Sequence, residues 1–177
     1  MLSVVSGQMQ TSSTLNPQHL KLLLGRPRHL YIHIPFCHRR CAYCDFNTYA
    51  NMEDRMEAYV MALCAEMQAL TKIPQAAPPQ QHAIEHGLTA ASLRPTIFLG
   101  GGTPSMLPIE LLVQVLEAAN RIIPLSDAEV TLEANPGTVL GRSYLGELRA
   151  LGVNRLSMGV QSLHDPCLLY TSDAADE

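Results

Sequence analysis

Four short apolar runs alternate with longer amphipathic segments, and this alternation constrains the fold of the chain more than any other feature. The runs typical of strands cover residues 30–34, 96–99, 129–134 and 154–160. The segments with apolar residues at three- and four-residue steps, typical of helices, cover residues 51–70, 108–123 and 143–151. The resulting order βαβαβαβ predicts a parallel sheet covered by helices.

Local signals set the expected ends and faces of these elements. Asn51 is the predicted N-cap of the first helix, and Pro108 suits the first turn of the second. Gly152 predicts the end of the third helix. In the first strand, alternation places Ile32 and Ile34 on one face and the residues between them on the other. The apolar stripe of the first helix is formed by Met52, Met56, Tyr59, Val60, Leu63, Met67 and Leu70, with Cys64 on the same side as a buried small hydrophobe.

Three of the five cysteines, Cys37, Cys41 and Cys44, follow the first strand at the spacing C-x3-C-x2-C. Three thiolates from one loop suit a metal ion or an iron–sulfur cluster, and a four-iron cluster with three cysteine ligands keeps one iron open for chemistry. A structural Cys3His zinc site that recruits His33 or His38 is the alternative. A disulfide framework is less favoured, because the chain is long, its cysteines are few and no secretory signal is visible.

The other candidate site residues lie where predicted strands end. The run Gly100-Gly-Gly-Thr-Pro104 follows the second strand and predicts a backbone turn that a ligand can approach closely. Glu133 lies at the end of the third strand, and Gln161 follows the fourth. Barrel enzymes place their active sites at the carboxyl ends of parallel strands. The cysteines, the glycines and these two polar residues therefore predict one shared site.

Composition limits the remaining functional classes. The chain has 177 residues, 47% of them hydrophobic, and a formal net charge of −4, so one sizeable core is expected and nucleic acid is not expected as the main partner. No apolar run reaches the roughly 20 residues needed to cross a bilayer, and we expect a cytoplasmic protein with at most peripheral membrane contact.

Residues 1–29 contain no acidic residue and are expected to form a disordered leader, with a mitochondrial transit peptide as the alternative. The connection over 71–94 is expected to be irregular and to leave His82 and His86 solvated.

Five motifs, YIHIPFC, CxxxCxxC, FLGGGTPS, TLEANPG and RLSMGVQS, occur in this order along the chain. Together they resemble the radical S-adenosyl-L-methionine (SAM) family that contains oxygen-independent coproporphyrinogen III oxidase and the haem chaperone HemW. The resemblance covers residues 30–165 and implies an α/β fold, the N-terminal part of a partial (β/α)6 TIM-like barrel that is incomplete at its C-terminus. Residues 166–177 are then a tail outside the family pattern.

The resemblance also implies a 4Fe-4S cluster on Cys37, Cys41 and Cys44, with SAM beside it. The residues that match SAM-binding positions of the family are Tyr31, Tyr43, Gly101, Gly102, Thr103, Glu133 and Gln161.

One local difference within the family bears on function. The oxidase branch resembles the pattern C-x3-C-x2-C-x-C, which has an additional cysteine two residues past the third. Here those two positions are Asp45 and Phe46, and this ending resembles HemW. The favoured implication is a haem chaperone that binds haem and SAM and works with a reductant protein and a haem-receiving protein. The alternative is an oxidase that decarboxylates coproporphyrinogen III to protoporphyrinogen IX.

Overall fold

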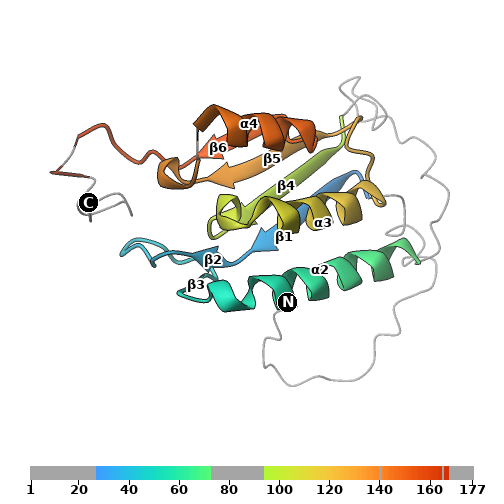
Figure 1. The fold of residues 1–177 in the computed structure, drawn as a ribbon, viewed down its shortest axis with the longest axis horizontal. Coiled ribbons are helices and arrows are strands. Elements are labelled where there is room, and N and C mark those ends of the chain that lie inside the picture. Colours follow the sequence, from blue (N-terminus) through green and yellow to red (C-terminus); the bar gives the residue numbers. More distant parts are fainter. Residues whose placement is uncertain (1–26, 73–93, 140, 165, 168–177) are drawn as a thin grey trace, which may run out of the picture.

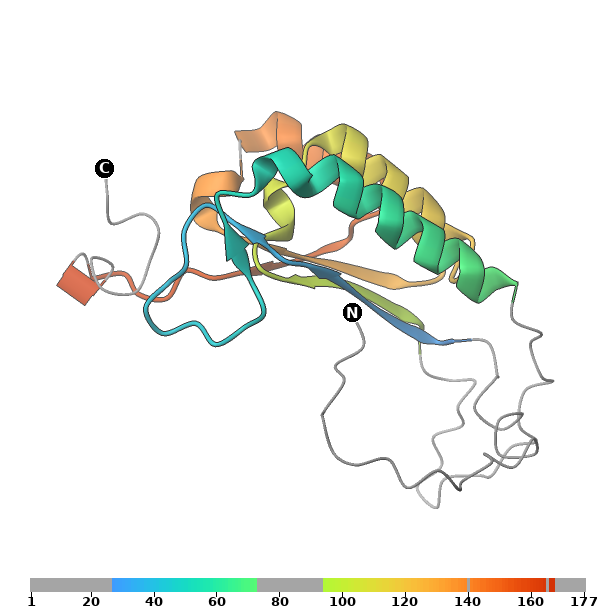
Figure 2. The same ribbon diagram turned by 90° about the horizontal axis from the view of Figure 1, so that it is seen from below.

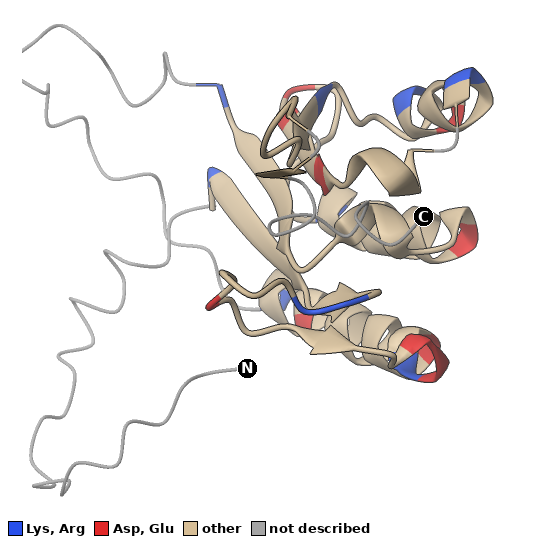
Figure 3. Ribbon diagram, turned by 90° about the vertical axis from the view of Figure 1, so that its left-hand side faces the viewer, with Lys and Arg blue, Asp and Glu red and all other residues tan. Residues whose placement is uncertain are grey.

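The computed structural model describes residues 27–72, 94–139, 141–164 and 166–167. The expected leader up to residue 26, most of the irregular connection with His82 and His86, and residues 168–177 lie outside the described residues. Within the described part, no helix is both long enough and apolar enough to cross a membrane. Figure 3 shows acidic and basic residues interspersed over this part of the chain rather than separated onto different faces.

Four parallel strands form the central sheet and confirm the predicted architecture (Figure 1). They are β1 (His29–Ile34), β4 (Thr96–Gly101), β5 (Glu129–Ala134) and β6 (Arg155–Met158), in the spatial order β1-β4-β5-β6. Three strands differ in length from their predictions. β1 begins at His29, one residue earlier than predicted and within the expected leader. β4 continues into the first two glycines of the turn, and β6 ends at Met158, two residues earlier than expected. Because all four strands are parallel, their carboxyl ends lie at the same edge of the sheet.

The three main helices lie together on one face of this sheet (Figure 2). They are α2 (Met56–Thr71), α3 (Ile109–Asn120) and α4 (Gly141–Ala150). A doubly wound sheet would carry helices on both faces, whereas the wall of a barrel carries them on its outside only. The described part is thus an α/β barrel segment whose helix-free face corresponds to the barrel interior.

Alternation along the strands decides which side chains meet the helices. Ile32 and Ile34 are buried, as predicted, while Tyr31 is exposed on the helix-free face. In the first helix the predicted stripe is confirmed at its centre, but Met52 and Leu70 at its ends are exposed. The fully buried side chains of the core come from β1, β4, β5 and all three helices, and include Ile34, Ile97, Leu99, Val130, Leu132, Val60, Leu112, Leu116 and Leu148.

The predicted N-cap of the first helix is wrong. Asn51 has a left-handed backbone with φ of 56°, and a short 3-10 turn (Glu53–Arg55) separates it from α2. The side chain of Asn51 therefore lies too early in the chain to cap the first backbone N–H groups of α2, which has no side-chain cap. At the other end of the series, Gly152 follows α4 with φ of 102° and confirms the predicted helix stop.

A small parallel pair of strands, absent from the sequence prediction, holds the two ends of the cysteine loop together. β2 (Phe36–Cys37) pairs with β3 (Tyr49–Ala50), and the N–H of Tyr49 donates to the carbonyl oxygen of Pro35 at 2.7 Å. The loop that carries the cysteines is therefore closed at its base and begins directly beyond the carboxyl end of β1.

Candidate functional site

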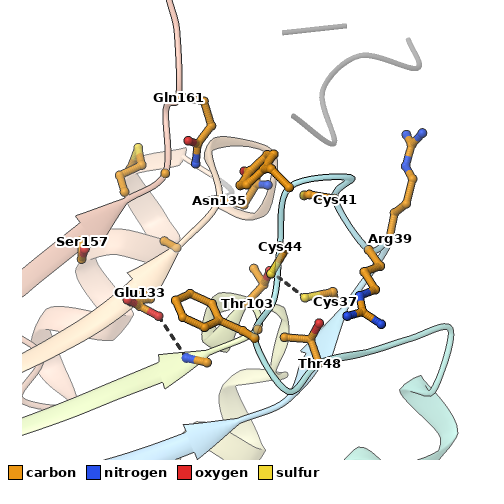
Figure 4. A pocket seen from close by; sticks show the side chains of 18 residues that line it. Cys37, Arg39, Cys41, Cys44, Thr48, Thr103, Glu133, Asn135, Ser157 and Gln161 are labelled. Atoms are coloured by element: carbon orange, nitrogen blue, oxygen red, sulfur yellow. Dashed lines mark hydrogen bonds between the residues drawn. The ribbon is translucent and has the colours of Figure 1, made fainter. Parts of the chain in front are cut away.

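A cavity of about 240 Å³ opens at the carboxyl edge of the sheet, between the cysteine loop and the ends of β4, β5 and β6 (Figure 4). It brings together nine of the ten residues that the sequence assigned to the site. These residues are Cys37, Cys41, Tyr43, Cys44, Gly101, Gly102, Thr103, Glu133 and Gln161. The tenth, Tyr31, does not line this cavity. Four segments that are far apart in the sequence thus meet in one place, as the strand-end argument predicted.

The glycine turn after β4 forms the floor of the cavity by packing directly against the chain that leads into the cysteine loop. The N–H of Gly102 donates to the carbonyl oxygen of Ile34 at 2.8 Å, and the N–H of Thr103 donates to that of Phe36 at 2.7 Å. A Cβ atom on Gly102 would lie 2.5 Å from the carbonyl oxygen of Phe36. Glycine is therefore required at position 102 by close contact with the backbone of Phe36.

Glu133 crosses from β5 to this turn. Its Oε2 atom accepts a hydrogen bond from the N–H of Gly101 at 3.0 Å, which fixes the direction of the half-buried carboxylate (Figure 4). A carboxylate held by one backbone donor keeps further lone pairs for a second donor. The position suits a hydroxyl or amino group of a ligand in the cavity.

The three cysteines of the loop form no disulfide bond within the described residues and are all partly exposed. Thr103 donates from its hydroxyl to the sulfur of Cys37 at 3.8 Å, and a turn closed by the N–H of Cys44 on the carbonyl oxygen of Cys41 shapes the loop tip. No three His, Cys, Asp or Glu side chains in the described ranges already stand in a metal-binding arrangement. The three thiols nevertheless line the same cavity.

Neither histidine of the alternative zinc site lies in the cavity. The Nε2 atom of His33 contacts the carbonyl oxygen of Asn47 at 2.9 Å, and its Nδ1 atom contacts the hydroxyl of Tyr31 at 3.1 Å. Because a carbonyl oxygen only accepts, Nε2 carries a proton, and in the neutral imidazole Tyr31 then donates to Nδ1. His38 faces Glu53 instead, at 3.6 Å. The structure thus gives the three cysteines no histidine partner from this pair.

Tyr31 lies on the helix-free face of β1, beside the cavity rather than in it. Its ring stacks on that of Phe98 with centroids 6.1 Å apart, and its hydroxyl donates to His33. Partial burial, and to a smaller extent the negative charge of Glu133, raise the pKa of Tyr31. The phenol therefore stays protonated near neutral pH and remains a donor.

Several residues that line the cavity were not among the predicted site residues, although some of them belong to the quoted motifs. They are Arg39, Arg40, Phe46, Thr48, Asn135, Ser157 and Met158. Asn135 follows β5 in the run TLEANPG and was open to prediction as a strand-end residue. Thr48 was not, because its place depends on the unpredicted pairing of β2 with β3.

The remaining two cysteines lie away from the cavity. Cys64 is half-buried on α2, where its thiol donates to the carbonyl oxygen of Gln114 at 3.6 Å, and burial raises its pKa. The sequence predicts a buried Cys64, so this prediction is only partly met. Cys167 is exposed.

Comparison with known proteins gives a consistent family. A sequence model of the Radical SAM superfamily matches residues 31–172. The chain is 39% identical to heme chaperone HemW of Haemophilus influenzae, over 78% of this chain and 34% of that protein. It is 40% identical to HemW of Escherichia coli, over 78% and 33% of the two chains. It is 36% identical to the mitochondrial radical S-adenosyl methionine domain-containing protein 1 of Danio rerio, over 86% and 32%.

Among solved structures, the coproporphyrinogen III oxidase HemN of Escherichia coli, described as a radical SAM enzyme, has a similar fold. The TM-score is 0.65 and the sequences are 25% identical, with 90% of this chain and 34% of that chain covered. The chain thus spans about a third of the length of the curated relatives it matches.

Proposed function

This chain belongs to the radical SAM superfamily, and we propose that it is a HemW-type haem chaperone that holds a 4Fe-4S cluster and SAM in the cavity at the carboxyl edge of its sheet. The observation that carries the proposal is the convergence of the cysteine loop, the glycine turn, Glu133 and Gln161 on that one cavity.

The residues of the cavity suit both groups. Cys37, Cys41 and Cys44 would ligate three irons, which keeps the fourth iron open for SAM. When bound, the cluster supplies an electron for the reductive cleavage of SAM. The backbone of the glycine turn approaches the cavity without side chains, and Glu133 offers an oriented carboxylate to a hydroxyl or amino group of SAM. Tyr43, Thr103 and Gln161 complete the proposed SAM-binding set.

The haem part of the proposal rests on the loop and on the relatives. The oxidases of this family resemble the pattern C-x3-C-x2-C-x-C, and Phe46 stands at the position of its fourth cysteine. Phe46 lines the cavity and is 67% exposed. Proteins named as heme chaperones are 36–40% identical to the chain. A chaperone of this kind also needs a reductant protein for its cluster and a protein that receives haem, and both belong to the proposal.

A second candidate function is the oxidative decarboxylation of coproporphyrinogen III. The specific observation in its favour is the fold similarity to HemN over 90% of this chain. The cysteine loop and the glycine turn are compatible with both functions, because either protein would use SAM.

The test uses one anaerobic preparation of the 177-residue chain, reconstituted with iron and sulfide. Haem titration followed by absorbance is expected to show stoichiometric binding, and incubation with coproporphyrinogen III, SAM and a reductant is expected to yield no protoporphyrinogen IX by chromatography. HemW of Escherichia coli and HemN serve as positive controls for the two assays. Turnover without haem binding would reverse the choice, and failure to bind haem beside a binding HemW control would remove the chaperone assignment.

A further inference from the structure

Thr48 carries a buried hydroxyl that has no partner in the described structure. The residue is 9% exposed, and its Oγ1 atom makes no hydrogen bond. A buried hydroxyl without a partner is costly, since it loses its hydrogen bonds to water. Thr48 lines the same cavity as the three cysteines, so a bound group could satisfy it.

The backbone on both sides of Thr48 is fixed, which prevents the residue from turning outward. Asn47 accepts a hydrogen bond from His33 through its carbonyl oxygen, and the N–H of Tyr49 donates to Pro35 at 2.7 Å. Tyr49 also begins β3, which pairs with β2 next to Cys37. Because threonine is branched at Cβ and restricted about χ1, its hydroxyl is aimed by this fixed backbone.

The hydroxyl of Thr48 points toward Cys37 in the close view of the cavity (Figure 4). On another side of the same cysteine, Thr103 already donates to the sulfur at 3.8 Å. Two threonine hydroxyls thus face the first thiol of the cysteine loop: that of Thr103 donates to it, and that of Thr48 points toward it without a hydrogen bond. Thiolates and sulfides accept hydrogen bonds, and such bonds are among the features that set the potential of an iron–sulfur cluster.

We propose that Thr48 is a positioning residue that donates a hydrogen bond to a sulfur of the bound cluster, at Cys37 or at a neighbouring sulfide, and so raises the reduction potential of the cluster. This inference rests on the proposed function. A hydrogen bond to sulfur stabilises the reduced state more than the oxidised state, because reduction adds negative charge to the cluster. Thr48 would thus favour acceptance of an electron from the reductant.

The test compares the wild-type chain with Thr48→Val and Thr48→Ser after anaerobic reconstitution. Valine keeps the shape and removes the hydroxyl, whereas serine keeps the hydroxyl. The midpoint potential, followed by electron paramagnetic resonance during redox titration, is expected to fall in Thr48→Val and to return toward the wild-type value in Thr48→Ser. The expected fall is about a tenfold change in the reduction equilibrium, about 59 mV for a one-electron couple. Thr96→Val is the matched control, since its hydroxyl contacts His29 at the opposite end of the sheet, and should leave the potential unchanged.

A second readout is the thermal stability of the chain without cluster. Thr48→Val is expected to melt no lower than the wild type, because the hydroxyl it loses has no partner there. A marked drop would show a structural partner and overturn the inference, as would equal potentials in wild type and Thr48→Val. Loss of cluster in Thr48→Val that serine restores would support it, and loss in both variants would overturn it. If the wild-type chain itself assembles no cluster, the proposed function fails, and the inference fails with it.

Discussion

Serine at Cys37, Cys41 or Cys44 is expected to abolish cluster assembly, with the bound iron falling from about four per chain to background after anaerobic reconstitution. A hydroxyl ligates iron poorly compared with a thiolate, and the cavity has no other cysteine to replace the one removed. Iron and sulfide analysis together with the visible absorbance of each single variant measures the effect.

The remaining cysteines provide matched controls for this experiment. Cys64 lies on α2 and Cys167 lies beyond β6, and neither lines the cavity. Cys64→Ser and Cys167→Ser are therefore expected to retain the full iron content. Equal loss of iron in all five single variants would show that the effect is not local. Full iron binding by the triple variant of the loop would contradict the assignment of the ligands.

Alanine at Gly102 is expected to damage both the fold and the site. The added methyl group would lie 2.5 Å from the carbonyl oxygen of Phe36 and 2.9 Å from the carbonyl carbon of Pro35, and backbone atoms cannot turn aside as a flexible side chain can. Forced overpacking of this kind costs about 1–3 kcal/mol of unfolding free energy. Because the displaced segment leads into Cys37, bound iron is expected to fall as well. Denaturant unfolding and iron analysis on the same variant measure the two effects.

Gly146 offers the matched control for this substitution. It lies within α4, and a Cβ atom there would meet nothing within 4 Å. Gly146→Ala is expected to leave iron binding unchanged and to stabilise the chain by about 0.5–1 kcal/mol, because glycine weakens a helix interior. If the two variants lost the same amount of stability, the close contact between the glycine turn and the cysteine loop would not be a determinant of the fold.

The sheet and most of the cavity could be predicted from the sequence, because both depend on signals of short range. Alternation along β1 was enough to bury Ile32 and Ile34, and the common carboxyl edge of parallel strands was enough to bring Glu133 and Gln161 to the cysteines. The position of each site residue at a strand end was therefore as informative as its chemical type.

The parts that were not predicted depend on tertiary packing. Asn51 is a residue type that often caps helices, but a 3-10 turn separates it from α2, so its side chain does not cap that helix. Thr48 and the pairing of β2 with β3 depend on how the two ends of a loop meet, which no periodic pattern records. Tyr31 belongs to a matching motif, yet its ring stacks on Phe98 beside the cavity. The reason is that Tyr31 lies within β1, before the carboxyl end of the strand at Ile34.

The central claim, that the cavity holds a 4Fe-4S cluster with an iron open to SAM, is tested most directly by electron paramagnetic resonance of the reconstituted and reduced chain with and without SAM. We expect a signal of a reduced four-iron cluster that disappears in the Cys41→Ser variant and changes shape when SAM is added to the wild type. Stoichiometric zinc without an iron-dependent signal, or a cluster signal that SAM leaves unchanged, would contradict it.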